Sequence, residues 1–298
     1  MYLRFDKPPE SLLQCLALCS NLRFIIVWNP DSLNHSAPIL AELSRTATEL
    51  RVLKWLLITD TAEEATKCVP KFTELRQLEL VLVTKTQFKN ALHSWGNGLL
   101  PHLESLSLRG SICIILKRIL EWRMPRLSSL LIQIYYKNDY DLTIAHALQV
   151  IDTLSSTLTT LHFIARGRCD IRTVLRKPIN LKEFAFEVGN ARQSLAHATH
   201  DNIETIELYE LYHRVYAPYV GVERAKDGRF LSLFTRKAFP KIRRVRMKNP
   251  CMSPVYRDYV ENSTYLENWR ASIEHARKEG FRFEHQNGNE ICLESPTM

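Results

Sequence analysis

The feature that most constrains this chain is one apolar spacing that recurs nine times, an aliphatic or aromatic residue at i, i+3 and i+5. The triplets are Leu22/Ile25/Val27, Leu50/Leu53/Trp55, Leu75/Leu78/Leu80, Leu103/Leu106/Leu108, Leu127/Leu130/Ile132, Leu158/Leu161/Phe163, Leu181/Phe184/Phe186, Ile203/Ile206/Leu208 and Ile242/Val245/Met247. Only the second is ambiguous, because Leu53/Leu56/Ile58 fits equally well. The mean step between triplets is near 27.5 residues, within the roughly 20–29-residue period of leucine-rich repeats. Such a unit buries its strand face only when neighbours stack on it.

Helical periodicity separates the triplets. In residues 111–122 the apolar positions form one stripe that Pro125 ends, and in residues 141–155 Ile144, Ala147, Leu148 and Ile151 form another. Shorter stripes occur at 36–48, 61–68 and 87–95. The sequence therefore predicts an α/β leucine-rich-repeat solenoid over residues 1–263, with a curved parallel β-sheet on its concave face and helices on its convex face.

Both ends of the array carry signals of a cap. Residues 9–20, with Leu12, Leu13, Leu16 and Ala17, predict an N-terminal helix over the first strand. Residues 264–298 open with the capping box Thr264–Glu267, continue as a helix that Gly280 ends, and contain the hairpin signal Asn287-Gly288 between residues 281–285 and 289–293. We expect this C-terminal helix and hairpin to belong to the same structural unit as the solenoid and to cover its last strand.

Composition narrows the setting. Apolar residues make up 45% and charged residues 24%, no apolar run approaches the roughly 18 residues of a membrane span, and residues 1–6 lack a secretory layout. Seven cysteines, an odd number without a Cys-x-x-Cys pair, predict reduced thiols rather than disulfides. We expect a soluble protein in the cytoplasm or nucleus that does not contact a membrane.

Signals for catalysis are weak. Glycine is scarce, and neither a phosphate-binding loop nor a nucleophile elbow occurs. His197 and His200 have the spacing of a metal-binding pair, but no third ligand lies near them in the sequence, and a solvent-exposed helix end is the favoured interpretation. Single histidines such as His93, His146 and His162 are interpreted as structural. We therefore expect no enzyme, no cofactor and no metal.

The strands offer better material for binding, because side chains between the apolar anchors must face the concave surface. These positions are Gln77, Glu79, Ser105, Ser107, Arg109, Ser129, Gln133, Thr160, His162, Glu183, Glu187, Thr205, Glu207, Tyr209, Arg244, Arg246 and Lys248. If the last two units pair directly, Glu207 lies beside Arg246. Two interpretations stay open for these charges: a lateral ladder in which they neutralise one another, or a recognition patch.

A Tyr-rich segment follows the eighth triplet, and Tyr with Arg is the composition of binding hot spots. The candidate binding residues are Glu183, Glu187, Glu207, Tyr209, Tyr212, Arg214, Tyr216, Tyr219, Arg244, Arg246 and Lys248. Equally, the tyrosines could pack the insertion onto the end cap. An alternative function follows from the net charge of +8: binding of nucleic acid or another anion through Arg236, Lys237, Lys241, Arg243, Arg244, Arg246 and Lys248.

The irregular repeats, the proline-led strand starts at 122–127 and 239–242, and the closing segment from Trp269 to Glu284 resemble the leucine-rich-repeat portion of basidiomycete F-box-type proteins. The resemblance covers nearly the whole chain. It implies a non-enzymatic substrate receptor whose repeats bind a protein, while an N-terminal F-box docks the Skp adaptor of a cullin ubiquitin ligase. The residues before Leu22 are too few for an F-box, so we expect that module to be absent here. The Skp adaptor is then a partner only if an F-box precedes this chain.

Overall fold

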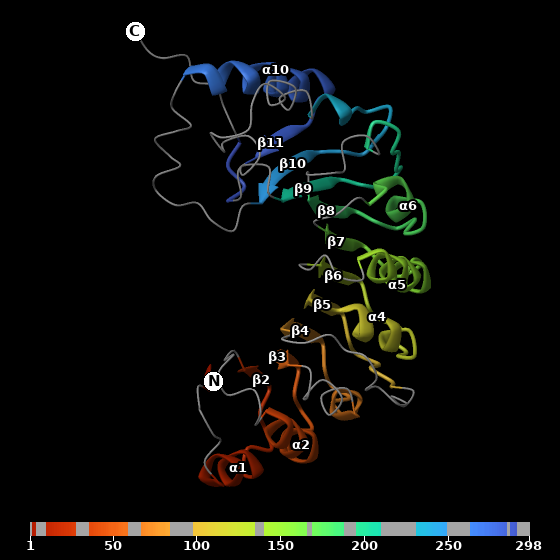
Figure 1. Cartoon of the computed structure of the whole chain (residues 1–298). Coiled ribbons are helices and arrows are strands. Elements are labelled where there is room, and N and C mark those ends of the chain that lie inside the picture. Colours follow the sequence, from red (N-terminus) through yellow and green to blue (C-terminus); the bar gives the residue numbers. More distant parts are fainter. Residues whose placement is uncertain are drawn as a thin grey trace. The chain divides into compact units, whose positions relative to one another are not determined.

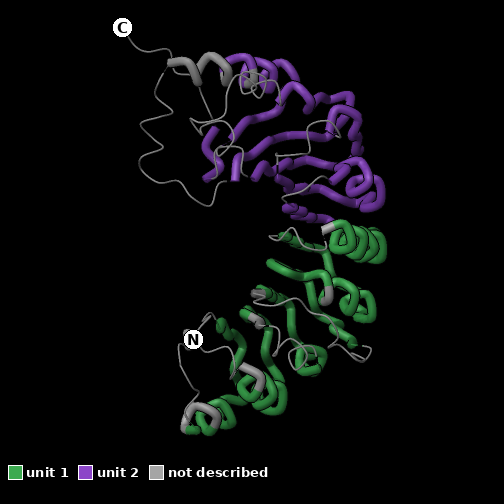
Figure 2. The backbone as a smooth tube through the Cα atoms, in the orientation of Figure 1, with its two compact units in different colours: residues 1–158 green, residues 159–298 purple. Residues whose placement is uncertain are grey.

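The structure is a computed structural model, and it describes residues 2–3, 10–27, 36–58, 67–83, 98–134, 140–165, 169–187, 195–209, 231–248, 263–284 and 287–290. The chain forms two compact units, residues 1–158 and residues 159–298 (Figure 2). Residues 264–298, predicted to form a C-terminal cap, fall in the second unit together with the last three apolar triplets.

Unit 1 is an α/β unit built on parallel strands. Its strands are β1 Tyr2–Leu3, β2 Phe24–Val27, β3 Val52–Ile58, β4 Gln77–Val83, β5 Ser105–Gly110 and β6 Ser129–Ile134, and each pairs in parallel with the next. Its helices are α1 Glu10–Ala17, α2 Ser36–Thr46, the 3₁₀ turn η2 Val69–Lys71, α4 Cys113–Ile119 and α5 Tyr140–Thr153. Helices α2, α4 and α5 lie on one side of these strands (Figure 1).

Unit 2 repeats this construction. Its strands are β7 Thr160–Ala165, β8 Glu183–Glu187, β9 Thr205–Tyr209, β10 Arg244–Lys248 and β11 Arg282–Glu284, again paired in parallel in chain order. Its helices are α6 Ile171–Leu175 and α10 Ser263–Glu279. The predicted α/β class with a parallel sheet is therefore confirmed within each unit.

The apolar triplets set the strand register. In unit 1 their second residues pair in one row, and their third residues pair in another: Ile25, Leu53, Leu78, Leu106 and Leu130, then Val27, Trp55, Leu80, Leu108 and Ile132. All ten side chains are buried. The pairing of Leu53 with Leu78 resolves the ambiguous second triplet as Leu50/Leu53/Trp55. A register slip of one residue would expose every anchor, so the core itself fixes the alignment.

Unit 2 has the same two rows with larger side chains. Leu161, Phe184, Ile206, Val245 and Phe283 form the first row, and Phe163, Phe186, Leu208 and Met247 form the second. The rings of Phe184 and Phe186 stack with centroids 5.2 Å apart. Each aromatic side chain buries a large apolar area, so the short strands of unit 2 still contribute a substantial core.

Backbone hydrogen bonds lock the same register at the strand starts. The carbonyl of the residue after the first anchor accepts two successive N–H groups of the next strand. Arg23 accepts from Arg51 and Val52 at 2.9 and 3.1 Å, and Lys182 accepts from Glu204 and Thr205 at 2.8 and 3.0 Å. This contact uses no side chain, so it does not depend on which residues occupy the strand starts.

Two helix predictions differ from the structure in detail. In α5 the buried side chains are Thr143, Ala147, Val150 and Ile151, whereas Ile144 and Leu148 are only half-buried. The buried stripe is therefore rotated from the predicted one: it includes Thr143 and Val150 and leaves Ile144 and Leu148 at its edge. In α1 Leu16 is buried but Ala17 is exposed. The expected stripe at 87–95 and most of 61–68 fall outside the described residues.

The C-terminal segment is partly different from the predicted cap. Helix α10 ends at Glu279, and Gly280 follows with a φ of +72°. Strand β11 then pairs in parallel with β10, with Phe283 opposite Val245, so it is a further strand of the sheet. No apolar triplet marks this strand, because Gly280 occupies the position of the first anchor. Of the hairpin, the structure describes one antiparallel bridge between Glu284 and Glu290 across Gly288, and residues 291–293 lie outside.

None of the helices in the described part of the chain combines the length and the apolar character that crossing a membrane requires. Within the same ranges, five cysteines are free thiols: Cys15, Cys19, Cys68, Cys113 and Cys169.

Candidate functional site

Side chains between the anchors point away from the buried rows and form a polar face on each unit. The unit 1 polar face includes Lys54, Glu79, Ser107, Arg109 and Gln133. The unit 2 polar face consists of Thr160, His162, Glu183, Ala185, Glu187, Thr205, Glu207, Tyr209, Arg244, Arg246, Lys248, Arg282 and Glu284.

Charges on the unit 1 polar face pair across strands. Glu79 on β4 forms ion pairs with residues of both neighbouring strands: Lys54 Nζ of β3 and Arg109 Nε of β5 each lie 3.2 Å from one of its carboxylate oxygens. Arg109 Nε also donates to Ser107 Oγ at 3.3 Å. The result is a ladder over three strands in which one carboxylate serves two cations.

On the unit 2 polar face the ladder is deeper. Glu207 lies opposite Arg246, as predicted, and its Oε1 contacts Arg246 Nη1 at 3.3 Å and Lys248 Nζ at 3.2 Å. Arg246 Nη2 also contacts Glu284 Oε2 at 2.9 Å. The side chains of Glu207 and Glu284 are only 2% and 3% exposed. These two carboxylates therefore depend on Arg246 for compensation of a buried charge.

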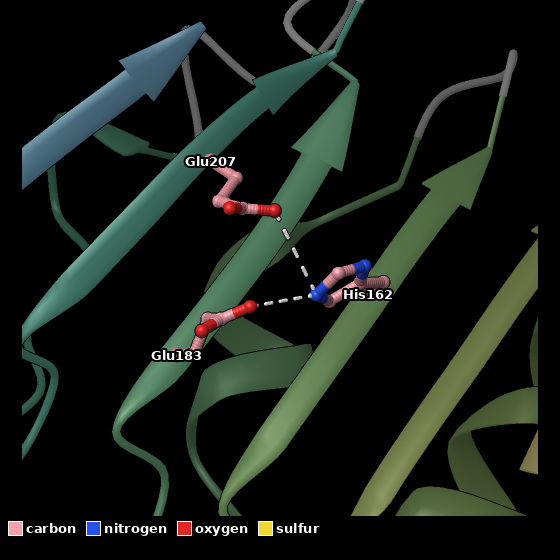
Figure 3. Close-up of side chains that lie close together, drawn as sticks. All are labelled: His162, Glu183 and Glu207. Atoms are coloured by element: carbon pink, nitrogen blue, oxygen red, sulfur yellow. Dashed lines mark hydrogen bonds and ion pairs between the residues drawn. The ribbon is translucent and has the colours of Figure 1, made fainter. Parts of the chain in front are cut away.

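A second cluster lies beside this ladder. His162 on β7 places Nε2 3.0 Å from Glu183 Oε1 and 3.8 Å from Glu207 Oε2 (Figure 3). His162 and Glu207 come from strands that are not adjacent: both pair with Ala185 of β8. The methyl group of Ala185 is short enough for the two longer side chains to approach each other above it. Glu183 lies two residues before Ala185 on β8, and its side chain extends toward His162.

The electrostatics of the cluster are uneven. The hydrogen bond from His162 lowers the pKa of Glu183, burial opposes this, and the positive charges of His162, Lys248 and Arg244 add to the lowering. Glu207 differs, because its Oε2 is buried and accepts no hydrogen bond in the described part of the chain. An unsatisfied buried acceptor costs about 1–3 kcal/mol. The cluster thus holds an acceptor that lacks a donor.

The remaining candidate residues have mixed positions. Arg244 Nε donates to Thr205 Oγ1 at 2.9 Å. Tyr209 is half-buried, with its ring centroid 6.2 Å from that of His162. Glu187 is buried, at 9% exposure, so it is not open to a partner in the way that the alternation predicts. Tyr212, Arg214, Tyr216 and Tyr219 lie outside the described residues.

The basic residues of the nucleic-acid alternative are largely engaged within the chain. Arg236 donates to the carbonyls of Glu279, Gly280 and Pro240 at 2.6–3.0 Å, and so ties the end of α10 to the turn before β10. Lys241 Nζ donates to Asn202 Oδ1 at 2.6 Å, and Arg243 Nε lies 3.5 Å from Glu204 Oε2. A cation that already has an intramolecular partner contributes less to anion binding.

The histidines divide differently from the prediction. His200 is buried and bonded to the Pro178 carbonyl at 2.9 Å and to the Asn202 N–H, while His197 is exposed, so the two do not form a metal pair. His146 contacts Cys113 Sγ at 3.7 Å. His162 faces the polar side of its strand, as the alternation predicts, but its surroundings are not apolar, because it lies between two carboxylates. Aligning the triplets row by row would have brought His162, Ala185 and Glu207 together, since each follows its second anchor by one residue.

No protein-family model matches the sequence, and no curated protein matches it.

Proposed function

We propose that this chain is a leucine-rich-repeat solenoid that acts as a non-enzymatic recognition scaffold, an F-box-like substrate receptor or a relic of one, and binds a protein partner across its strands. The observation that supports it best is the shared register of the apolar triplets. This register directs every intervening side chain of a unit to one face. A face built from successive strands is an extended surface of the kind that repeat proteins use for binding.

Residue chemistry supports a protein as the ligand. Arg244, Lys248 and Tyr209 are half-buried on the unit 2 polar face, and Arg109 and Gln133 are half-buried on the unit 1 polar face. Arg and Tyr contribute contact area and directed hydrogen bonds, which makes them frequent at protein interfaces. Ion pairs with Glu207 and Glu79 hold some of these side chains in place, so less conformational entropy is lost on binding. The Skp adaptor enters this proposal only if an F-box precedes the chain.

Affinity capture with face variants tests the proposal. The face variant is Arg244→Gln with Lys248→Gln; Arg246 stays, because the buried Glu207 and Glu284 need it. The control is Arg176→Gln with Lys177→Gln, which removes the same charge from two exposed positions just after α6. Proteins bound by the wild type and by the control should be recovered roughly tenfold less with the face variant. Equal recovery by all three chains contradicts the assignment of the site to this face.

The nucleic-acid alternative predicts a different measurement. Binding through phosphates falls steeply as salt increases, because each contact releases a counterion. Titration of single- and double-stranded RNA and DNA at two salt concentrations therefore separates the two functions. Binding that is strong at low salt and steeply salt-dependent favours the alternative, and the absence of binding at low salt removes it.

A further inference from the structure

The cluster on β7, β8 and β9 has the donor set of a metal site. His162 supplies an imidazole nitrogen, and Glu183 and Glu207 each supply a carboxylate oxygen. The three ligand atoms lie within 4.8 Å of one another. Imidazole with carboxylate is a common ligand combination for Zn²⁺ and for neighbouring divalent transition metals. Because each donor comes from a different strand, the register of the sheet holds the set together.

Glu207 Oε2 is the observation that points to a cation. The side chain is 2% exposed, and this oxygen lies 3.8 Å from His162 Nε2 without a hydrogen-bond donor. Its other oxygen, Oε1, carries both cationic contacts, to Arg246 and Lys248. The two oxygens of Glu207 therefore have different surroundings. Oε1 pairs with Arg246 and Lys248, whereas Oε2 faces His162. A metal ion would complete the coordination of that oxygen.

The spacing suits a tetrahedral ion. With Zn–N and Zn–O distances of about 2.0–2.2 Å, ligand atoms around zinc lie about 3.4 Å apart. The observed distances of 3.0 and 3.8 Å from His162 Nε2 bracket this value, so small rotations of the two carboxylates would suffice. Ala185 of β8 separates His162 from Glu207 in the register and contributes only a methyl group between them. The side chains of His162 and Glu183 are 17% and 31% exposed, which gives an ion a path from the solvent.

We propose that His162, Glu183 and Glu207 form a divalent-cation site on the unit 2 polar face, and that Zn²⁺ fits it best. Two carboxylates and a neutral imidazole balance the charge of the ion. Three protein ligands leave a fourth position of a tetrahedral ion open on the polar face. The adjacent cations Arg246 and Lys248 weaken the attraction but leave Oε2 free to bind. This proposal is independent of whether the face also binds a protein.

Zinc binding by the untagged full chain tests the site. Equilibrium dialysis against Zn²⁺ should give one ion bound per chain, with an affinity that falls in the variants below, and Co²⁺ in its place should show the visible d–d bands of tetrahedral coordination. His162→Gln and, separately, Glu183→Gln should each weaken Zn²⁺ binding roughly tenfold or more and abolish the Co²⁺ bands. Glu183→Gln is the safer of the two for folding because Glu183 is the most exposed ligand. Circular dichroism and urea unfolding verify that both variants fold.

The matched control is His102→Gln. His102 Nε2 lies 3.9 Å from Glu74 Oε1, another histidine–glutamate pair, but no third ligand completes it among the described residues. This variant should bind Zn²⁺ and produce Co²⁺ bands like the wild type. The proposal is overturned if the wild type binds no Zn²⁺, or if the folded His162→Gln and Glu183→Gln variants retain wild-type affinity, which would mean an adventitious ion only.

Discussion

Arg246 is the one residue in the described part of unit 2 that forms ion pairs with both Glu207 and Glu284. It contacts Glu207 and Glu284, both almost fully buried. Removing one partner of a buried pair costs about 3–5 kcal/mol, because the other charge stays buried without compensation. Lys248 still contacts Glu207, and Arg282 Nη2 still lies 3.5 Å from Glu284 Oε1, so the lower end of that range applies.

Arg246→Met should therefore lower the free energy of unfolding by about 3 kcal/mol, measured by urea denaturation at pH 7. The control is Arg243→Met. Arg243 directly precedes β10, its side chain is 74% exposed, and its Nε lies 3.5 Å from Glu204 Oε2. That pair is worth at most about 1 kcal/mol. Equal losses in the two variants would show that Glu207 and Glu284 do not depend on Arg246.

Asp170 shows how one side chain can cap a short helix and sense pH. It is the N-cap of α6 and accepts from the Arg172 N–H at 3.0 Å, while the Arg172 side chain contacts its Oδ2 at 2.7 Å. The pKa of Asp170 is lowered, first by the hydrogen bond from the Arg172 side chain, with burial opposing. A lowered folded pKa stabilises the protein above the unfolded pKa of about 3.9, and the stabilisation is lost as pH falls through the folded pKa.

Asp170→Ala should thus lower the free energy of unfolding by about 1 kcal/mol at pH 7, and this difference should shrink as the pH is lowered toward 3.5. Asp170→Asn keeps an oxygen acceptor for the cap and loses only a solvent-screened ion pair, so its loss should be smaller. Urea denaturation at several pH values measures both. A difference for Asp170→Ala that is constant with pH would mean that the carboxylate charge contributes nothing.

At the scale of elements, close approach of neighbouring strands limits which residues fit at their ends. Gly110 closes β5 with a φ of +99°, and a Cβ there would lie 2.0 Å from the Leu82 carbonyl oxygen of β4. Gly280, after α10, also has a positive φ, but the nearest atom to its Cβ would be Arg236 Nη2 at 3.6 Å. Only the first glycine combines a left-handed backbone with a steric clash.

Gly110→Ala should lower the free energy of unfolding by about 3 kcal/mol, since β4 and β5 must separate or distort to admit the methyl group. Gly280→Ala should lower it by about 1 kcal/mol, the strain of the left-handed conformation alone. Denaturation of both variants under one condition gives the comparison. A Gly110→Ala loss no larger than that of Gly280→Ala would mean that the β4–β5 contact yields easily.

Most of the strand architecture was predictable from the triplets, because an anchor both faces the core and fixes the register. The contact between Glu207 and Arg246 followed from that register alone. Strand β11 was not predictable in this way, since Gly280 replaces an anchor and its burial comes from packing under α10 and beside β10. The His162 cluster depends on the small size of Ala185, a property that periodicity does not weigh. Spacing places His162 and Glu207 in one row, but side-chain size and tertiary packing decide whether they touch.

At the scale of the whole molecule, the chain divides into two compact units although the triplets continue on both sides of residue 158. The sequence gives no sign of this division, because the spacing looks the same on each side. In repeat proteins, stability is close to a sum of unit stabilities and nearest-neighbour terms. For the solenoid proposed above, loss of an anchor should therefore act mainly on the strands nearest to it.

Hydrogen exchange measures this locality. Phe184→Ala removes a buried ring from β8, and Leu78→Ala removes a matched second anchor from β4; both side chains are nearly fully buried. Each should cost about 3 kcal/mol locally. In Phe184→Ala, amide exchange should accelerate most in β7–β9 and less in β2–β5, and Leu78→Ala should show the reverse. A nearest-neighbour array confines the effect of a lost anchor to the strands around it. Equal acceleration of exchange in every strand of both variants would therefore mean that the 298 residues unfold as one cooperative unit.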